Sequence, residues 1–529
     1  MLHGAYQQLY TRLLSHIPSA RIFHDDLRIL ALGTDASFYR LLPRVAIRAN
    51  DEAEIGCILR ECAALQLPVT FRAAGTSLSG QAISDSVLVV IDQSWKNIRI
   101  EEEGALVRLQ PGVLGCAANK ALLPLGKKIG PDPASIDAAM IGGIAANNAS
   151  GMCCGTAQNS YRTLAGLRLL LADGTLFDGL DAEAVNRFRR DRADLLNQLL
   201  ELRRKLLTNT ALAARVHEKF KMKNTCGYSL NALVDYADPV DILQHLMIGS
   251  EGTLAFLAEI GYHTVPEYRD KASSLILFPD IETACRAVSI LKNAPVSAVE
   301  IMDRAALRSV EGKKGMPDYL AGLPAAAASL LVETRAAAPD QLQGQIATIR
   351  AALAAVPVLR PITFTLDPAE YSKLWNIRKG LFPAVGAVRP KGTTVIIEDV
   401  AFPVPRLAEA TLELQSLFKK HGYDDTIIFG HALEGNLHFV FKQNFNLPDE
   451  ARRYQRFMDE VCHMVVERYD GALKAEHGTG RNMAPYVGLE WGDAAMEIMH
   501  GIKRIFDPAG ILNPGVILND DPEVHLKNL

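Results

Sequence analysis

The amino-acid sequence predicts an α+β protein with two large domains and a helical C-terminal segment. The chain has 529 residues, of which 49% are hydrophobic and 22% charged, a balance typical of a globular protein with a large core. Strand and helix patterns alternate in the first half, and from about Ala272 a second set of strands is separated by alanine-rich helices. The predicted parts are a helical lead-in (1–43), a first domain (44–266) with a helical insertion at about 181–220, a second domain (267–470) and a C-terminal segment (471–529).

Charge and hydropathy exclude several classes of protein. The formal net charge is −4 and no basic run stands out, so we expect no nucleic-acid partner. No stretch approaches the ~18 apolar residues of a membrane span, and the N-terminus lacks the apolar core of a signal peptide. We therefore expect a cytoplasmic protein, either free or peripheral to the inner face of the membrane. The eight cysteines form no C-x-x-C pair, which excludes the usual iron–sulfur ligand runs within this chain.

The first domain opens with a strand, a helix and a second strand. We expect strands over 45–47 and 68–71, with a helix between them that begins after Asp51. Asp51 and Glu54 have the spacing of a capping box, and the apolar residues that follow recur at helical spacing. Further strands are expected over 87–91 and 105–109, and the Asp-Gly pair within 167–175 predicts a hairpin.

Three glycine-rich segments punctuate this domain. Residues 72–81 offer successive backbone N–H groups suited to an anion, although a plain glycine-rich turn explains them equally well. The segment is no P-loop, because Gln81 stands where the lysine would be, and no G-x-G-x-x-G follows a strand. Residues 141–151 carry too few large side chains to form a core, which favours a flat cofactor against their backbone. A glycine-flanked turn at 249–255 precedes another strand.

The second domain contains a hairpin with two histidines. We expect its strands over 275–278, 328–333, 363–366 and 394–398, followed by a hairpin with strands at 426–429 and 437–441. His431 and His438 then converge near the turn, because cross-strand neighbours lie about 5 Å apart at Cβ. With the Glu476 carboxylate they would form a set suited to a divalent cation with open positions. Two histidines near a turn are nevertheless more often hydrogen-bonded structural residues.

Seven motifs occur in an order that identifies a family. The chain resembles the FAD-linked D-2-hydroxyacid dehydrogenases of the vanillyl-alcohol oxidase type, which include D-lactate dehydrogenase, D-2-hydroxyglutarate dehydrogenase and the flavin subunit of glycolate oxidase. The resemblance covers about residues 40–515 and implies an FAD-binding domain of two subdomains plus an antiparallel-sheet cap domain. The motifs are 72–81, 130–132, 142–151, 249–253, 430–438, 476–478 and 512–515.

The resemblance implies that the first domain holds FAD. Family members with covalent flavin carry a histidine in the first glycine-rich loop, and Thr76 stands at that place, so we expect noncovalent FAD. The pyrophosphate would lie on the backbone of 72–77. The implied cofactor-binding residues are Arg72, Ala74, Gly75, Thr76, Ser77, Gly80, Gln81, Pro131, Asp132, Gly142, Gly143, Asn147, Ser150, Gly151, Glu251, Gly252, Leu254, Asn436 and Asn513.

The resemblance also implies the catalytic residues. His477 is the expected base for the hydroxyl proton of a 2-hydroxy acid, and Arg378 the expected partner of its carboxylate. His431, His438 and Glu476 are the expected ligands of a divalent metal, Zn²⁺ or Mn²⁺, that polarises the hydroxyl. For Arg378 taken alone, a surface helix arginine remains an alternative.

Two departures from the family bear on the substrate and the electron acceptor. Members that act on 2-hydroxyglutarate carry a threonine and a lysine where Phe382 and Ile397 stand, so a small monocarboxylate such as D-lactate is favoured. Arg389 and Lys391 are close in sequence and could bind a second carboxylate, so D-2-hydroxyglutarate stays an alternative substrate. Glycolate is another alternative. Because the sequence lacks clustered cysteines, we expect electrons to leave to an iron–sulfur domain or subunit, a cytochrome or a quinone. An oxidase, a transferase of the alkylglycerone-phosphate synthase type and a non-catalytic flavin-binding subunit are the other hypotheses.

Overall fold

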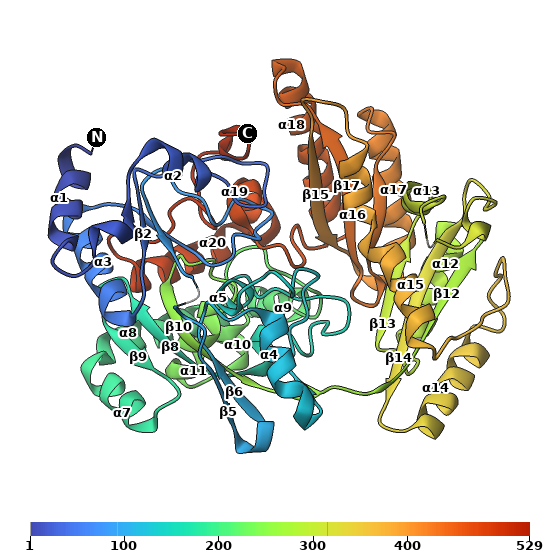
Figure 1. Ribbon diagram of the computed structural model, residues 1–529, viewed down its shortest axis with the longest axis horizontal. Coiled ribbons are helices and arrows are strands. Elements are labelled where there is room, and N and C mark those ends of the chain that lie inside the picture. The colour runs from blue at the N-terminus through green and yellow to red at the C-terminus, as the bar shows by residue number, and fades with distance from the viewer. Residues whose placement is uncertain (1, 93, 315) are drawn as a thin grey trace. The chain divides into compact units, whose positions relative to one another are not determined.

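The computed structural model describes residues 2–92, 94–314 and 316–529, which divide into two compact units (Figure 1). The first unit comprises Met1–Ser150, Thr156–Pro266 and Glu476–Leu529. The second comprises Gly151–Gly155 and Glu267–Ala475. Among the described residues, no helix has both the length and the apolar character needed to cross a membrane.

A small mixed sheet begins the first unit. Its strands follow the order β1-β2-β4-β3, in which β2, β4 and β3 are parallel and β1 is antiparallel to β2. The parallel pairing arises because the helix α3 carries the chain back between β2 and β3. The bounds are β1 Ile22–Phe23, β2 Val45–Arg48, α3 Glu52–Leu65, β3 Val69–Arg72 and β4 Val87–Val90.

The start of α3 has the predicted Asp51 cap, but the Glu54 carboxylate bonds to the residue before the cap and not to the Asp51 N–H of a full capping box. The Asp51 carboxylate accepts a hydrogen bond from the Glu54 N–H at 2.9 Å, as an N-cap residue does. The Glu54 carboxylate accepts from the Asn50 N–H at 2.8 Å and also pairs with Arg21. The lead-in was expected to be helical, but it also supplies the edge strand β1 through Ile22 and Phe23.

A second sheet in the first unit is wholly antiparallel, with the order β5-β6-β10-β8-β9. The predicted Asp-Gly hairpin is confirmed, since β8 pairs with β9 and Gly174 adopts φ +81° at the turn. The two sheets share one core, because Phe256 and Ala258 of β10 pack with residues of α3 and β2. The bounds are β5 Ile98–Glu101, β6 Leu106–Leu109, β8 Leu164–Leu171, β9 Leu176–Asp178 and β10 Ala255–His263.

Helices surround these sheets. The predicted insertion is helical, as α7, α8 and α9. The helices and short strands are α1 Gly4–Leu13, α2 Asp26–Ala31, α4 Gly115–Leu122, β7 Lys127–Lys128, α5 Ile141–Ala146, α6 Ser160–Thr163, α7 Ala182–Asp191, α8 Ala193–Thr208, α9 Thr210–Lys219, α10 Ala232–Asp235, α11 Pro239–Met247, β11 Val265–Pro266, α19 Gly480–Met483 and α20 Val487–Phe506.

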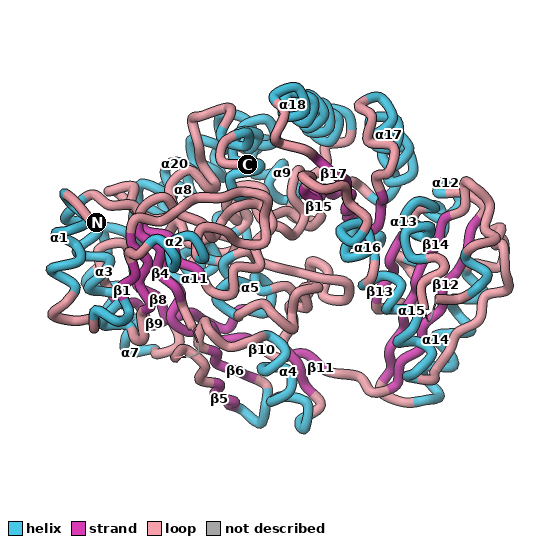
Figure 2. Tube along the Cα trace, turned by 45° about the horizontal axis from the view of Figure 1, so that its top comes forward, coloured by secondary structure: helices cyan, strands magenta, loops and turns pink. Residues whose placement is uncertain are grey.

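The second unit is built on a six-stranded antiparallel sheet with the order β12-β14-β13-β16-β17-β15 (Figure 2). The strands are β12 Asp270–Phe278, β13 Ala298–Met302, β14 Ala328–Ala336, β15 Thr394–Ala401, β16 Ile427–His431 and β17 Asn436–Gln443. The helices are α12 Ile281–Leu291, α13 Arg304–Val310, α14 Pro339–Ala352, α15 Pro368–Lys379, α16 Leu381–Ala387, α17 Leu407–Lys420 and α18 Pro448–His463.

Two strand predictions differ from the observed sheet. Residues 363–366 form no strand, because only Thr365 makes a bridge, to Ser273 at the sheet edge, before Asp367 caps α15. The strand β13 was missed, although it occupies the middle of the sheet between β14 and β16. The predicted histidine hairpin is confirmed as β16 and β17, with Phe429 opposite His438.

The two faces of this sheet differ in chemistry. Residues alternate between faces along each strand, so Met302, Phe429 and Val440 point toward the cluster that includes α13, α15 and α16. By the same period of two, Glu300 and His431 lie on this face. The face therefore combines an apolar core with buried ionisable groups.

The buried carboxyl of Asp303 makes the stability of this unit depend on pH. It caps α13 by accepting from the Ala306 N–H at 2.7 Å, and burial raises its pKa from 3.8 to about 6. Stability from the protonated form is complete below pH 3.8 and is lost as pH rises through about 6. Asp303→Asn keeps a capping oxygen, so its free energy of unfolding should exceed that of the wild type by about 1–3 kcal/mol at neutral pH.

Denaturant unfolding at neutral pH and near pH 4.5 measures this difference, which should shrink at the lower pH. Asp280→Asn is the matched control, because hydrogen bonding to the Thr283 N–H lowers the pKa of Asp280, the N-cap of α12. Because the pKa of Asp280 is lowered and not raised, the Asp280→Asn protein should be less stable than the wild type at neutral pH. An Asp303→Asn protein less stable than the wild type at neutral pH would contradict the account.

Candidate functional site

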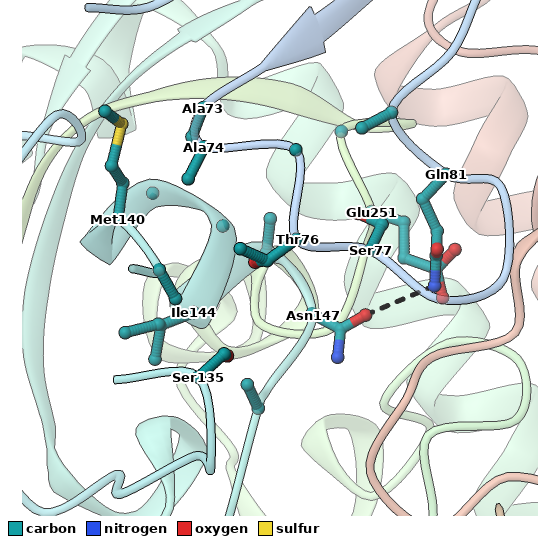
Figure 3. Close-up of a pocket in the computed structure, with 18 of the residues that line it drawn as sticks. Ala73, Ala74, Thr76, Ser77, Gln81, Ser135, Met140, Ile144, Asn147 and Glu251 are labelled. Carbon is teal, nitrogen blue, oxygen red and sulfur yellow. Dashed lines mark hydrogen bonds between the residues drawn. The ribbon is translucent and has the colours of Figure 1, made fainter. Parts of the chain in front are cut away.

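A cavity of about 400 Å³ opens within the first unit (Figure 3). Its walls are the loop after β3, the helix α5, the segment before α5 and the turn that leads into β10. Small apolar side chains such as Ala73, Ala139 and Ala146 make up much of the surface. In the view of Figure 3, Met140 lies on the opposite side from Gln81. The cavity thus suits a ligand with both apolar and polar parts.

At two glycines in the wall, neighbouring protein atoms would leave room for a side chain. A Cβ added to Gly143 would meet no atom closer than 3.9 Å, the Cβ of Ala73. A Cβ on Gly252 would likewise meet only Phe71, at 3.9 Å, although its φ of +71° also favours glycine. Open space beside a glycine that faces a cavity is what close approach of a cofactor to the backbone requires.

Amide side chains fasten the backbone of Glu476 and His477 to this wall. Gln81 Nε2 donates to the His477 carbonyl at 2.7 Å, and Asn147 Nδ2 donates to the Glu476 carbonyl at 2.7 Å. Gly478 follows with φ +79°, and a Cβ there would meet the Asn147 amide oxygen at 2.3 Å. Only glycine fits this position, so the chain after His477 is held in one path along the cavity.

The Glu476 side chain has its own buried partners in the first unit. Lys223 Nζ lies 3.0 Å from Glu476 Oε2, and Ser150 Oγ donates to the same oxygen at 3.2 Å. Lys223 is almost completely buried, so this pair neutralises two charges out of contact with water. The two contacts fix the direction of the carboxylate.

Eleven of the predicted cofactor residues line the cavity. Two other predicted residues bond to the backbone of lining residues. Asn513 Nδ2 donates to the carbonyls of Gln81 and Glu251, and Arg72 Nε donates to the Ala82 carbonyl at 2.7 Å. The lining set is Ala74, Gly75, Thr76, Ser77, Gln81, Gly142, Gly143, Asn147, Ser150, Glu251 and Gly252. The predicted residues outside the lining set are Arg72, Gly80, Pro131, Asp132, Gly151, Leu254, Asn436 and Asn513.

Sequence reasoning missed part of the cavity wall. It selected Pro131 and Asp132, whereas the lining residues are Pro133, Ala134 and Ser135 of the same loop. The glycine and proline signals located the loop but not the side that faces inward. His477, predicted as the base, also lines the cavity.

A second cluster of functional groups lies within the second unit. The rings of His431 and His438 have centroids 5.2 Å apart, and both side chains are buried. Arg378, in the last turn of α15, lies over the Phe429 ring at 4.2 Å. The hairpin therefore brings two imidazoles together on one face of the sheet, and α15 places the Arg378 guanidinium against the same face.

Glu300 joins two members of this cluster. Its Oε2 accepts from Arg378 Nε at 2.6 Å, and its Oε1 lies 2.6 Å from His431 Nδ1. Burial would raise the pKa of Glu300, but its electrostatic interactions and hydrogen bonds with His431 and Arg378 lower the pKa below its ordinary value. Glu300 was not predicted from the sequence, although a charged residue within the apolar run 298–302 is a signal of a buried, paired carboxylate.

His438 has a weaker carboxylate neighbour. Asp399 Oδ1 lies 3.4 Å from His438 Nδ1 and accepts from Asn436 Nδ2 at 2.6 Å. Asn436, predicted to lie near the flavin, is thus oriented by β15 within the second unit. Glu476, predicted as the third metal ligand, belongs to the first unit.

Family models match both parts of the chain. Residues 43–179 match a model described as an FAD binding domain, and residues 267–517 match the C-terminal domain of FAD linked oxidases. The chain belongs to the FAD-linked oxidases. It is an FAD-dependent oxidoreductase, and the family resemblance predicted from the sequence is confirmed.

Curated relatives of this FAD-linked oxidase carry several names. It is 27% identical to the glycolate oxidase subunit GlcD of Escherichia coli (strain K12) over 509 residues, covering 95% of this chain and 89% of that one. It is 26% identical to the D-lactate dehydrogenase of Anaerostipes hadrus, with 93% and 92% covered. The D-2-hydroxyglutarate dehydrogenase of Pantoea ananatis is 26% identical over 92% of this chain and 49% of its own. Identity alone therefore does not separate the three substrates.

Solved structures confirm the fold class. A substrate complex of p-cresol methylhydroxylase aligns with a TM-score of 0.70 at 12% identity, covering 98% of this chain and 99% of that one. 4-Ethylphenol oxidase from Gulosibacter chungangensis aligns with a TM-score of 0.68 at 15% identity, covering 97% of each. At such identities the likeness concerns the fold, which is the predicted α+β fold of the vanillyl-alcohol oxidase type.

The space beside Gly143 predicts the effect of filling the cavity. Gly143→Leu should leave the protein folded but lower the flavin-to-protein absorbance ratio at least about tenfold, because the new side chain occupies room that FAD needs. Gly344→Leu is the matched control, since a Cβ at this position in α14 meets no atom within 4 Å. Full flavin content in Gly143→Leu would show that the cofactor lies elsewhere.

Proposed function

We propose that this FAD-dependent oxidoreductase oxidises a small D-2-hydroxy acid, with D-lactate as the substrate and pyruvate as the product. The buried cluster of Arg378, His431 and His438 on one sheet face carries the proposal. A 2-hydroxy acid presents a carboxylate and a hydroxyl on adjacent carbons, and the cluster offers a guanidinium for the first and imidazoles beside it for the second.

Each residue has a distinct role in the proposed reaction. Arg378 binds the substrate carboxylate with its terminal nitrogens, since its Nε is already bonded to Glu300. The His477 side chain takes the hydroxyl proton as the α-carbon loses a hydride. FAD, when bound, accepts that hydride. Because the His477 carbonyl is held by Gln81, its position on the cavity wall is fixed before substrate arrives.

The donor set also fits a divalent metal, which we propose to be Zn²⁺ or Mn²⁺. His431 and His438 would supply two imidazole ligands, and Glu476 is the carboxylate that the sequence assigns to the same ion. Imidazole and carboxylate together suit these two cations. The metal, when bound, would stabilise the negative charge that develops on the substrate oxygen.

The preference for a small substrate rests on Phe382 and Ile397. Phe382, in α16, and Ile397, on β15, stand where relatives that act on 2-hydroxyglutarate carry a threonine and a lysine, and neither side chain can pair with a distal carboxylate. Arg389 and Lys391 are exposed. We therefore favour a monocarboxylate over D-2-hydroxyglutarate, and we propose that an iron–sulfur domain or subunit, a cytochrome or a quinone reoxidises the flavin.

Substitution of Arg378 tests the proposed function. Arg378→Ala should lower kcat/KM for D-lactate by about 10²- to 10³-fold, mostly through KM, because a charge-assisted pair with the carboxylate is lost. Arg378→Lys should recover part of this loss, since it restores the charge but not the planar fork. Lys379→Ala removes an exposed neighbouring cation and serves as the control.

Steady-state kinetics with a dye acceptor and matched flavin content give the answer. Unchanged kcat/KM in Arg378→Ala would mean that another group binds the carboxylate. Activity with D-2-hydroxyglutarate alone would refute the proposed substrate and point to Arg389 or Lys391.

A further inference from the structure

Glu300 is a fully buried carboxylate at the centre of the second unit's polar cluster. It projects from the middle of β13, and both of its oxygens are engaged within 2.6 Å, one by Arg378 and one by His431. Neither partner is close in sequence, since they lie 78 and 131 residues away. A carboxylate in such a place costs much free energy to bury unless close partners satisfy its charge, as Arg378 and His431 do here.

The contact with His431 decides which ring nitrogen is available. A carboxylate only accepts hydrogen bonds, so the Nδ1 that faces Glu300 must carry a proton. The neutral ring then keeps its lone pair on Nε2. A metal-binding histidine is commonly held in this way, by a carboxylate on the nitrogen that does not bind.

The contact with Arg378 directs the guanidinium. Glu300 accepts a hydrogen bond from Arg378 Nε, and the guanidinium carbon lies 4.2 Å from the centroid of the Phe429 ring. These two contacts restrain the plane of the group and leave its terminal nitrogens to other partners. One carboxylate thus orients both groups that the proposed reaction places on the substrate.

We propose that Glu300 is a positioning residue that holds His431 with Nε2 as its ligating atom and Arg378 with its terminal nitrogens toward the substrate carboxylate. The inference rests on the proposed function for the roles of these two groups, but the hydrogen-bond pattern itself does not depend on it. Asp399 is a poorer counterpart, because it lies 3.4 Å from His438 Nδ1 and is also bonded to Asn436.

The Glu300→Gln substitution separates the two roles of the carboxylate. Arginine never gives up its proton, so the amide oxygen of the new side chain must face Arg378 Nε. The amide NH₂ must then face His431 Nδ1, which can accept only if its proton moves to Nε2. The substitution therefore keeps Arg378 in place and converts His431 to the tautomer that cannot ligate through Nε2.

Glu333→Gln is the matched control. Glu333 is also buried on the same sheet face and accepts from Trp375 Nε1 at 2.7 Å and from Arg335 Nε at 2.6 Å. Trp375 lies three residues before Arg378 on α15, so both carboxylates pin the same helix to the sheet. The control carries a comparable cost of an amide facing two donors, but no histidine is involved.

Two measurements test the proposal. Titration of chelator-treated protein with Zn²⁺ or Mn²⁺ should give a Kd raised about 10- to 100-fold in Glu300→Gln and unchanged in Glu333→Gln. KM for D-lactate should change less than about threefold while kcat falls, because Arg378 stays oriented. Long-range ¹H–¹⁵N correlation of ¹⁵N-histidine-labelled, metal-free protein should show the His431 proton on Nδ1 in the wild type and on Nε2 in Glu300→Gln, with His431→Gln for assignment.

The outcomes distinguish this proposal from the proposed function. Wild-type protein that binds neither metal refutes the metal site, while the tautomer measurement still tests Glu300. An unchanged His431 tautomer in Glu300→Gln, or equal loss of metal affinity in both glutamine variants, would overturn the role given to Glu300.

Discussion

The Glu300 carboxylate, buried between Arg378 and His431, is the interaction on which the second unit's site depends. A buried charge is tolerated only with close partners, and here the partners are the groups that the proposed reaction uses. The opposite face of the same sheet satisfies a buried charge differently, through the Lys474–Glu398 pair at 2.7 Å. The first unit follows the same rule at Lys223 and Glu476. Buried ion pairs thus fix the direction of side chains that would otherwise rotate.

The cavity of the first unit shows a second feature, the absence of side chains at wall positions where a ligand could come close to the backbone. Gly143 and Gly252 leave open space, whereas Gly478 is required by its φ and by the amides around it. The wall therefore has two kinds of glycine. Some leave room for a ligand, and others are required by the backbone conformation or by close neighbouring atoms. Gln81, Asn147 and Asn513 link the loops into one frame by donating to backbone carbonyls.

Local patterns in the sequence predicted much of the fold and the broad class of the site. The Asp51 cap, the Asp-Gly hairpin and the histidine hairpin depend on neighbouring residues, and each appears as expected. The partners of Glu300 and Asp399 could not be predicted from local patterns, because the order of strands in the sheet brings these carboxylates to residues far along the chain. The run 363–366 shows the converse, since a strand-like composition did not suffice without a neighbour to pair along its whole length. Which residues of a loop face inward, as in Pro133 to Ser135, also depends on tertiary packing.

We propose that FAD, a divalent metal and the Arg378 cluster all take part in the oxidation of a small D-2-hydroxy acid. Anaerobic reduction of the bound flavin tests it most directly, with D-lactate, L-lactate, glycolate and D-2-hydroxyglutarate compared in metal-replete and chelator-treated protein. We expect D-lactate to bleach the flavin rapidly, a chelator to abolish this bleaching, and added Zn²⁺ or Mn²⁺ to restore it. Bleaching that is indifferent to the chelator, or that no 2-hydroxy acid produces, would contradict this proposal.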